Sequence, residues 1–217
     1  LGPIAALLNK KAVDLLCKRF LRRAEGESLS GLLYDLAERL ESSHPDMPSK
    51  RSGEVRPAFL GIIPSRSCNL SCAYCNFGSQ RAQKEMMDIR MAASAVDWMA
   101  EYMKGLGENM LDIHFFGGEP IIAEEVIDVV IHRARYVAGR MGMVPRFEAS
   151  TNGVFGEVRA RFVGDYFDSI ILSFDGRRND HDRHRPVKSG RGSFDTVVRT
   201  AHILGRSQVE LCFRCCV

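Results

Sequence analysis

From residue 58 onward, short apolar runs alternate with longer stretches in which apolar residues recur at three- and four-residue spacing. The short runs predict β-strands, and the longer stretches predict amphipathic helices. The predicted strands span residues 58–64, 110–116, 145–150, 168–174 and 208–217. The predicted helices between them span residues 91–106, 123–141, 155–163 and 192–205. Because each helix would return the chain to begin another parallel strand, the pattern predicts an α/β fold built from repeated βα units.

Residues 1–57 follow a different pattern. Two amphipathic helices are predicted at residues 9–24 and 28–43, the second with Ser28 or Ser30 as its N-cap. The residues that follow are rich in proline, serine, glycine and charge, which is typical of a linker. We therefore expect three parts, a helical extension at residues 1–45, a linker at residues 46–57 and the main domain at residues 58–217.

The composition is that of an ordinary globular protein, with 45% hydrophobic and 26% charged residues among 217. The formal net charge of +3 is too small to indicate binding to nucleic acid. The longest apolar runs fall far short of the roughly 20 residues of a membrane-spanning helix, and the N-terminus lacks a signal-peptide pattern. We expect a cytoplasmic protein with no nucleic-acid or membrane partner.

The residues best suited to chemistry follow the predicted strands. The first strand is followed by "SRSCNLSCAYC", the second by "GGEP", the third by "TNG" and the fourth by "DGRRNDHDRHRP". In α/β barrels the catalytic residues lie at the carboxyl ends of the strands, in loops carried by a rigid scaffold. The four segments therefore predict one functional site at one rim of the sheet.

Three cysteines, Cys68, Cys72 and Cys75, lie in the first of these segments with CxxxCxxC spacing. Thiolates favour zinc, copper(I) and iron–sulfur clusters, and a closed structural zinc site takes four protein ligands. A 4Fe–4S cluster also normally takes four cysteines, so three leave one iron open to a small molecule. A partial zinc site and three unrelated buried thiols are the alternatives.

The remaining cysteines do not extend this set. Side chains alternate along a strand, so Cys212 and Cys216 would lie on one face and Cys215 on the other. We expect these three in the interior of a β-strand and not at a second metal centre. Cys17 is expected to pack within a helix. Seven cysteines grouped in this way do not form a disulfide framework.

At the first cysteine segment the sequence resembles a known family. "CNLSCAYC", with an aromatic residue before the last cysteine, is similar to the cluster motif of the radical S-adenosylmethionine (SAM) enzymes. "FFGGEP" and "LSFDGRRNDHDRHRP" resemble segments of the peptide- and protein-modifying branch, which includes anaerobic sulfatase-maturating enzymes and SPASM-domain peptide maturases. The resemblance runs from residue 58 to about residue 217 and implies a partial (β/α)6 radical SAM barrel with five of six strands present.

The resemblance implies cofactors and a reaction. A 4Fe–4S cluster binds SAM at its open iron and cleaves it reductively to a 5′-deoxyadenosyl radical, which oxidatively modifies a peptide or protein side chain. Formylglycine formation and a cross-link are both open as outcomes, and a ferredoxin or flavodoxin would supply the electron. A non-catalytic iron–sulfur electron carrier is the alternative of another class, but it would have no use for "GGEP" or Arg185.

The resemblance also implies the site residues. The cluster ligands are Cys68, Cys72 and Cys75. The residues for SAM are Tyr74, Gly117, Gly118, Glu119, Ser150, Thr151, Asn152, Ser173 and Arg185. Tyr74 would pack on the adenine, and Arg185 would bind the SAM carboxylate with its forked guanidinium. Taken alone, "GG" and "TNG" are also ordinary turn sequences. Most of the basic side chains around Arg185 are expected to be solvated surface charges, namely Arg177, Arg178, His181, Arg183 and His184.

The two ends of the chain carry further expectations. The chain begins with leucine and ends inside a predicted strand, so we expect a fragment of a longer protein. The resemblance implies a sixth strand and a C-terminal SPASM-type region with auxiliary iron–sulfur clusters, so the fragment alone is not expected to complete the reaction. Residues 1–45 resemble the helical part of a leader-peptide-binding winged helix, and a helical extension that packs on the barrel is the alternative.

Overall fold

The computed structural model describes residues 56–75, 77 and 86–216. The predicted helical extension and most of the predicted linker lie outside the described residues. The strands are β1 (Leu60–Ile62), β2 (Met110–Phe115), β3 (Val144–Thr151), β4 (Ser169–Ser173) and β5 (Glu210–Arg214). The helices are α3 (Ile89–Gly105), α4 (Glu124–Met141), α5 (Glu157–Tyr166), α6 (Arg178–His184) and α7 (Phe194–Leu204), with a 3₁₀ turn η1 (Pro120–Ile122).

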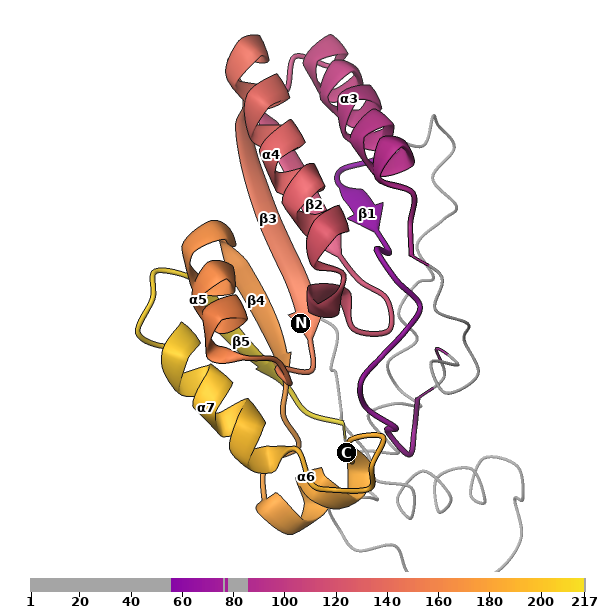
Figure 1. The fold of residues 1–217 in the computed structure, drawn as a ribbon. Helices are drawn as coiled ribbons and strands as arrows, with labels where there is room; N and C mark the ends of the chain where they lie inside the picture. The colour runs from indigo at the N-terminus through magenta and orange to yellow at the C-terminus, as the bar shows by residue number, and fades with distance from the viewer. Residues whose placement is uncertain (1–55, 76, 78–85, 217) are drawn as a thin grey trace, which may run out of the picture. The chain divides into compact units, whose positions relative to one another are not determined.

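The five strands form one sheet in the order β1-β2-β3-β4-β5, and every neighbouring pair is parallel. Strands that follow one another in the chain are therefore neighbours in the sheet, as in a barrel and unlike a doubly wound sheet, whose strand order reverses. Helices α3, α4, α5 and α7 lie along one face of this sheet (Figure 1). The predicted α/β fold of repeated βα units is confirmed.

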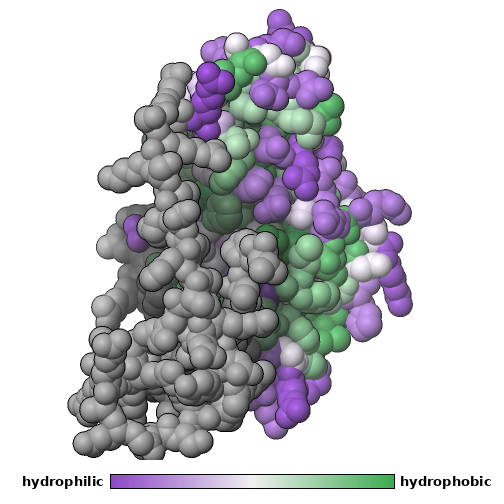
Figure 2. Space-filling view, turned by 180° about the vertical axis from the view of Figure 1, so that it is seen from behind, coloured by the Kyte–Doolittle hydropathy of each residue, from purple (hydrophilic) through white to green (hydrophobic). Residues whose placement is uncertain are grey.

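The core lies between the sheet and these helices. In β2, Leu111, Ile113 and Phe115 are fully buried toward the helices, whereas Asp112 and His114 alternate onto the opposite face. Each large apolar side chain buried in this way stabilises the fold by roughly 1.5–3 kcal/mol. Seen from behind, hydrophobic surface gathers at mid-height on the side where β4 and β5 lie (Figure 2). No helix in the described part of the chain is long and apolar enough to cross a membrane.

The structure differs from the predicted elements near the C-terminus. Strand β5 ends at Arg214, so the prediction that Cys215 and Cys216 lie inside a strand is wrong. Cys212 does lie in β5, but all three thiols are exposed. Among the described strands β5 pairs only with β4, so no further strand covers its other edge.

Helix α6 was not predicted. All seven of its residues are polar, and His181 is its only buried residue, so it lacks the apolar periodicity that marks a helix in a sequence. It lies near the carboxyl end of β4 (Figure 1), where the sequence predicts a functional loop. Its buried histidine contributes to the site described below.

Candidate active site

The cysteine loop, residues 65–75, is held on one side by the segment that follows β2. The backbone N–H of Gly118 donates to the carbonyl of Ser65, and that of Glu119 donates to the carbonyl of Ser67, at 3.2 and 2.9 Å. A Cβ atom at Gly118 would lie 2.2 Å from the Ser67 carbonyl oxygen, a distance that no side chain tolerates. The glycine is therefore required for the two segments to lie this close.

The same loop is held on its other side by the segment after α6. The Ser71 N–H donates to the Pro186 carbonyl at 2.8 Å, and the Ala73 N–H donates to the His184 carbonyl at 2.9 Å. The "GGEP" and "DGRRNDHDRHRP" segments, far apart in the sequence, thus contact the cysteine loop from two directions. The predicted assembly of these segments at one rim is present in the structure.

The three thiols differ in their surroundings. Cys68 is buried, whereas Cys72 and Cys75 are half-buried. The Leu70 N–H donates to the sulfur of Cys68 at 3.4 Å, and the Asn152 side-chain amide donates to it at 3.5 Å. Burial raises the pKa of the Cys72 thiol to about 11, although the nearby Arg185 guanidinium acts in the opposite direction.

Glu119 is fully buried, and its carboxylate joins the β2 loop to the end of β3. It accepts hydrogen bonds from the Thr151 hydroxyl at 2.6 Å, the Asn152 N–H at 2.7 Å and the Ile121 N–H at 3.1 Å. Burial raises its pKa to about 7, against the effect of these donors. Its oxygens are thus engaged by protein groups, and its predicted contact with SAM stays a prediction.

Tyr74 and Arg185 meet at a third residue, Asp175, which sequence reasoning did not include in the site. The Arg185 guanidinium donates to both carboxylate oxygens of Asp175, and the Tyr74 hydroxyl donates to one of them at 2.8 Å. The guanidinium also lies over the Tyr74 ring, 5.1 Å from its centroid. Burial would raise the pKa of Asp175, but these donors and the Cys216 N–H outweigh it and lower the pKa.

His181 is fully buried, so it is an exception to the predicted solvated charges around Arg185. Its Nδ1 accepts from the Asp175 N–H at 3.2 Å, and its Nε2 lies 3.0 Å from the Ser193 hydroxyl, which itself donates to the Arg185 carbonyl. These partners fit a neutral ring protonated at Nε2, and burial lowers the pKa of His181. The histidine therefore fixes the backbone on both sides of the Asp175–Arg185 pair.

Two predicted serines lie at the ends of the central strands. Ser150 is on β3, and its buried hydroxyl has no hydrogen-bond partner among the described residues. Ser173 is the last residue of β4 and is half-buried. An unpaired buried hydroxyl costs stability unless another group satisfies it. Ser150 is thus suited to bind a ligand at this rim.

Comparison with known proteins identifies the chain. The family model of the radical SAM superfamily matches residues 62–217. The chain belongs to the radical SAM superfamily. Among curated relatives, the serine-type anaerobic sulfatase-maturating enzyme of Klebsiella aerogenes is 27% identical over 149 residues, which cover 66% of this chain and 36% of that enzyme.

Solved radical SAM structures resemble the described fold. Native anSMEcpe with bound AdoMet and Cp18Cys peptide has a TM-score of 0.64 and 26% identity, covering 74% of this chain and 43% of that chain. Streptococcus suis SuiB bound to S-adenosylmethionine has a TM-score of 0.53 at 16% identity and covers 95% of this chain and 44% of that one, so it supports the fold alone. The chain thus spans less than half the length of these relatives.

The radical SAM cofactors, a 4Fe–4S cluster and SAM, fit the residues present at this rim. Two N–H donors point at the Cys68 sulfur, as suits a metal-bound thiolate, and the Ser150 hydroxyl is buried without a partner in the described part. No three Cys, His, Asp or Glu side chains among residues 56–75, 77 and 86–216 are placed to hold a single metal ion. In a 4Fe–4S cluster each thiolate binds a different iron, so the thiols need not meet at one point.

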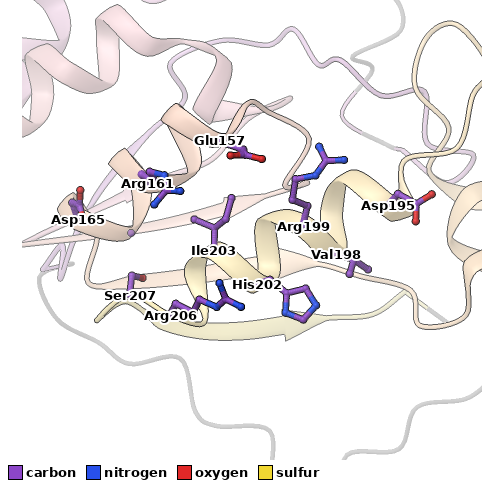
Figure 3. Close-up of a pocket in the computed structure, with 11 residues that line it drawn as sticks. Glu157, Arg161, Asp165, Asp195, Val198, Arg199, His202, Ile203, Arg206 and Ser207 are labelled. Carbon is purple, nitrogen blue, oxygen red and sulfur yellow. The ribbon is translucent and has the colours of Figure 1, made fainter.

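One groove on the surface is not part of this radical SAM site. It has a volume of about 920 Å³ and lies between α5 and α7 (Figure 3). Its lining includes the basic residues Arg161, Arg199 and Arg206 and the acidic residues Glu157, Asp165 and Asp195. None of the residues predicted for the cluster or for SAM lines it.

The structure brings the predicted residues together and adds others. The cysteine loop, the glycines, Asn152 and Arg185 are joined by direct contacts or through one intervening residue. The residues that sequence reasoning missed are Asn69, Asp175, His181 and Ser193. The sequence offered one signal for Asp175. It is an acidic residue just before a strongly basic segment, and a buried basic side chain from that segment needs an acidic partner. The roles predicted for single residues in SAM binding stay predictions.

Proposed function

We propose that the protein containing this chain is a radical SAM enzyme that modifies a peptide or protein side chain. The cysteine loop carries the proposal, because it offers three thiols and is held between the "GGEP" segment and the segment that bears Arg185. An electron carrier needs neither of these flanking segments. The match to the radical SAM family and the 26–27% identity to sulfatase-maturating enzymes support the same conclusion.

When bound, the 4Fe–4S cluster and SAM supply a 5′-deoxyadenosyl radical that abstracts a hydrogen atom from the substrate. In our proposal, Cys68, Cys72 and Cys75 hold the cluster. Ser150 and Ser173, at the carboxyl ends of β3 and β4, donate hydrogen bonds to SAM from the rim of the sheet.

Arg185 contributes to this site in two ways in our proposal. Its Nε and Nη2 atoms bind Asp175, whereas Nη1 makes no hydrogen bond within the described residues. That nitrogen is the donor we assign to the carboxylate of SAM. Tyr74 is 38% exposed, and in our proposal its ring packs on the adenine while its hydroxyl stays bound to Asp175.

The favoured product is formylglycine, formed by oxidation of a cysteine or serine side chain in a sulfatase. Similarity to the serine-type sulfatase-maturating enzyme and to anSMEcpe, which was solved with a Cp18Cys peptide, supports this outcome. A cross-link within a ribosomally made peptide is the second candidate. We assign the electron supply to a ferredoxin or flavodoxin in the cytoplasm.

Anaerobic reconstitution tests the proposed function. The full-length protein, loaded with iron and sulfide and mixed with SAM and dithionite, is expected to release 5′-deoxyadenosine, measured by liquid chromatography. Peptides with a central cysteine or serine would then be examined by mass spectrometry for the mass change of formylglycine. A cluster that takes up electrons but releases no 5′-deoxyadenosine would identify an electron carrier instead.

A further inference from the structure

The side-chain amide of Asn152, just after β3, lies against the sulfur of Cys68. The Nδ2 atom is 3.5 Å from Sγ, which is within hydrogen-bonding range for sulfur, and both residues are buried. The backbone N–H of Leu70 approaches the same sulfur at 3.4 Å. The Leu70 donor comes from the cysteine loop itself, whereas the Asn152 donor comes from the segment that follows β3. Asn152 therefore links the sheet directly to a cluster ligand.

The contacts of Val154 decide which end of the Asn152 amide faces the sulfur. The Val154 N–H donates to Asn152 Oδ1 at 2.8 Å, so Asn152 Nδ2 must point to the opposite side. The Asn69 amide donates to the Val154 carbonyl, which turns Asn69 Oδ1 toward Asn152 Nδ2, 2.8 Å away. Both amides are thus oriented by the backbone of one residue, and a flip of either would lose hydrogen bonds at both.

We propose that Asn152 is a positioning residue that raises the reduction potential of the 4Fe–4S cluster through its N–H···S bond to Cys68. The proposal rests on ligation of the cluster by Cys68 and on nothing that concerns the substrate. Reduction adds negative charge to the cluster and its sulfur ligands, so a donor aimed at a ligand stabilises the reduced state more than the oxidised state. This role is separate from the SAM ribose contact predicted for Asn152, because it acts without SAM.

A redox titration without SAM tests this role. In the reconstituted full-length protein, Asn152→Ser keeps an oxygen that can accept from the Val154 N–H but is too short to reach Cys68. We expect an equilibrium constant for reduction roughly threefold to tenfold lower, where tenfold corresponds to about 59 mV for one electron. Asn152→Asp, which replaces the donor with a negative oxygen, is expected to lower it further. The readout is the midpoint potential, followed by electron paramagnetic resonance of the reduced cluster.

The matched control is Asn109→Ser, because Asn109 is exposed and directly precedes β2, at the opposite end of the sheet from the cysteine loop. Its midpoint potential should equal that of the wild type. Equal potentials in the wild type, Asn152→Ser and Asn152→Asp would overturn the proposal while leaving the proposed enzyme activity intact. A wild-type protein that assembles no 4Fe–4S cluster would overturn both.

A measurement on the wild type keeps the test decisive if the Asn152 variants do not fold. With ¹⁵N in the asparagine side chains only, pulsed electron paramagnetic resonance of the reduced cluster should detect a ¹⁵N coupling through the N–H···S bond. Asn69 directs its own amide nitrogen at the Val154 carbonyl, so it is not the source of such a signal. The absence of this coupling would overturn the proposal without any substitution.

Discussion

Arg185 and Asp175 form a buried, bidentate ion pair in which Nε and Nη2 of the arginine donate to the two carboxylate oxygens at 2.8 and 3.0 Å. Their side chains are only 6% and 2% exposed. The pair lies between the carboxyl end of β4 and the segment that contacts the cysteine loop. Arg185 therefore holds the rim together, in addition to the contact with SAM that we assign to it.

The first prediction follows from this pair. Arg185→Ala leaves a buried carboxylate without its partner, so we expect the free energy of unfolding to fall by about 3–5 kcal/mol. Arg178→Ala is the matched control, because Arg178 forms a bidentate pair with Asp195 that is 52% and 71% exposed. Such an exposed pair contributes about 0–1 kcal/mol. Equal losses in the two variants, measured by urea denaturation, would show that burial of the Arg185 pair is unimportant.

The second prediction concerns the cluster ligands. Cys72→Ala removes one of three thiolates and leaves two irons of the cluster without a protein ligand, so we expect loss of bound iron and of the brown 4Fe–4S absorbance. Cys212→Ala, at an exposed cysteine on β5, should reconstitute like the wild type. Iron and sulfide analysis with visible absorption checks both. Full iron loading of the Cys72→Ala protein would contradict the assignment.

The third prediction concerns Gly118, whose position allows the β2 loop to contact the cysteine loop. In Gly118→Ala the new Cβ would collide with the Ser67 and Arg66 carbonyl oxygens, at 2.2 and 2.5 Å, so the two backbones must separate. We expect a less stable protein with a reduced yield of reconstituted cluster. Gly139→Ala is the control, because Gly139 lies in α4, where a new Cβ meets no atom within 4 Å apart from its neighbours and its own helix backbone. Alanine is also the better helix former by about 1 kcal/mol. Similar cluster yields in the two variants would argue against this role.

The fourth prediction is a pH dependence from Glu119. Its pKa rises from 4.5 to about 7 on folding, so the folded state prefers the protonated carboxyl. The resulting stabilisation is complete below pH 4.5 and is lost as the pH rises through about 7, an effect of about 3 kcal/mol. The stability difference between wild type and Glu119→Gln should therefore change across this window. Glu124→Gln, at the exposed start of α4, is the matched control because it removes one acidic group without touching the contacts of Glu119. Parallel pH profiles for wild type and Glu119→Gln would disprove the prediction.

The family and the order of the βα units were determined by the sequence alone, whereas the cluster ligands are predicted from it and stay a prediction. Apolar periodicity reports which residues face the core, and a short spacing such as that of Cys68, Cys72 and Cys75 is a local property of the chain. The end of β5 was predicted wrongly, and the polar helix α6 was missed. Their structure depends on neighbouring segments that local periodicity does not record.

The partners of the site residues were decided only by the tertiary structure. Nothing in the sequence pairs Arg185 with Asp175, or places the Asn152 amide on the sulfur of Cys68, 84 positions away. Hydrogen bonds and ion pairs of this kind depend on distances of a few ångströms between side chains from separate segments beyond the strand ends. Those distances are set by the packing of β2, β3 and β4 into one parallel sheet, which brings the ends of distant segments to the same rim.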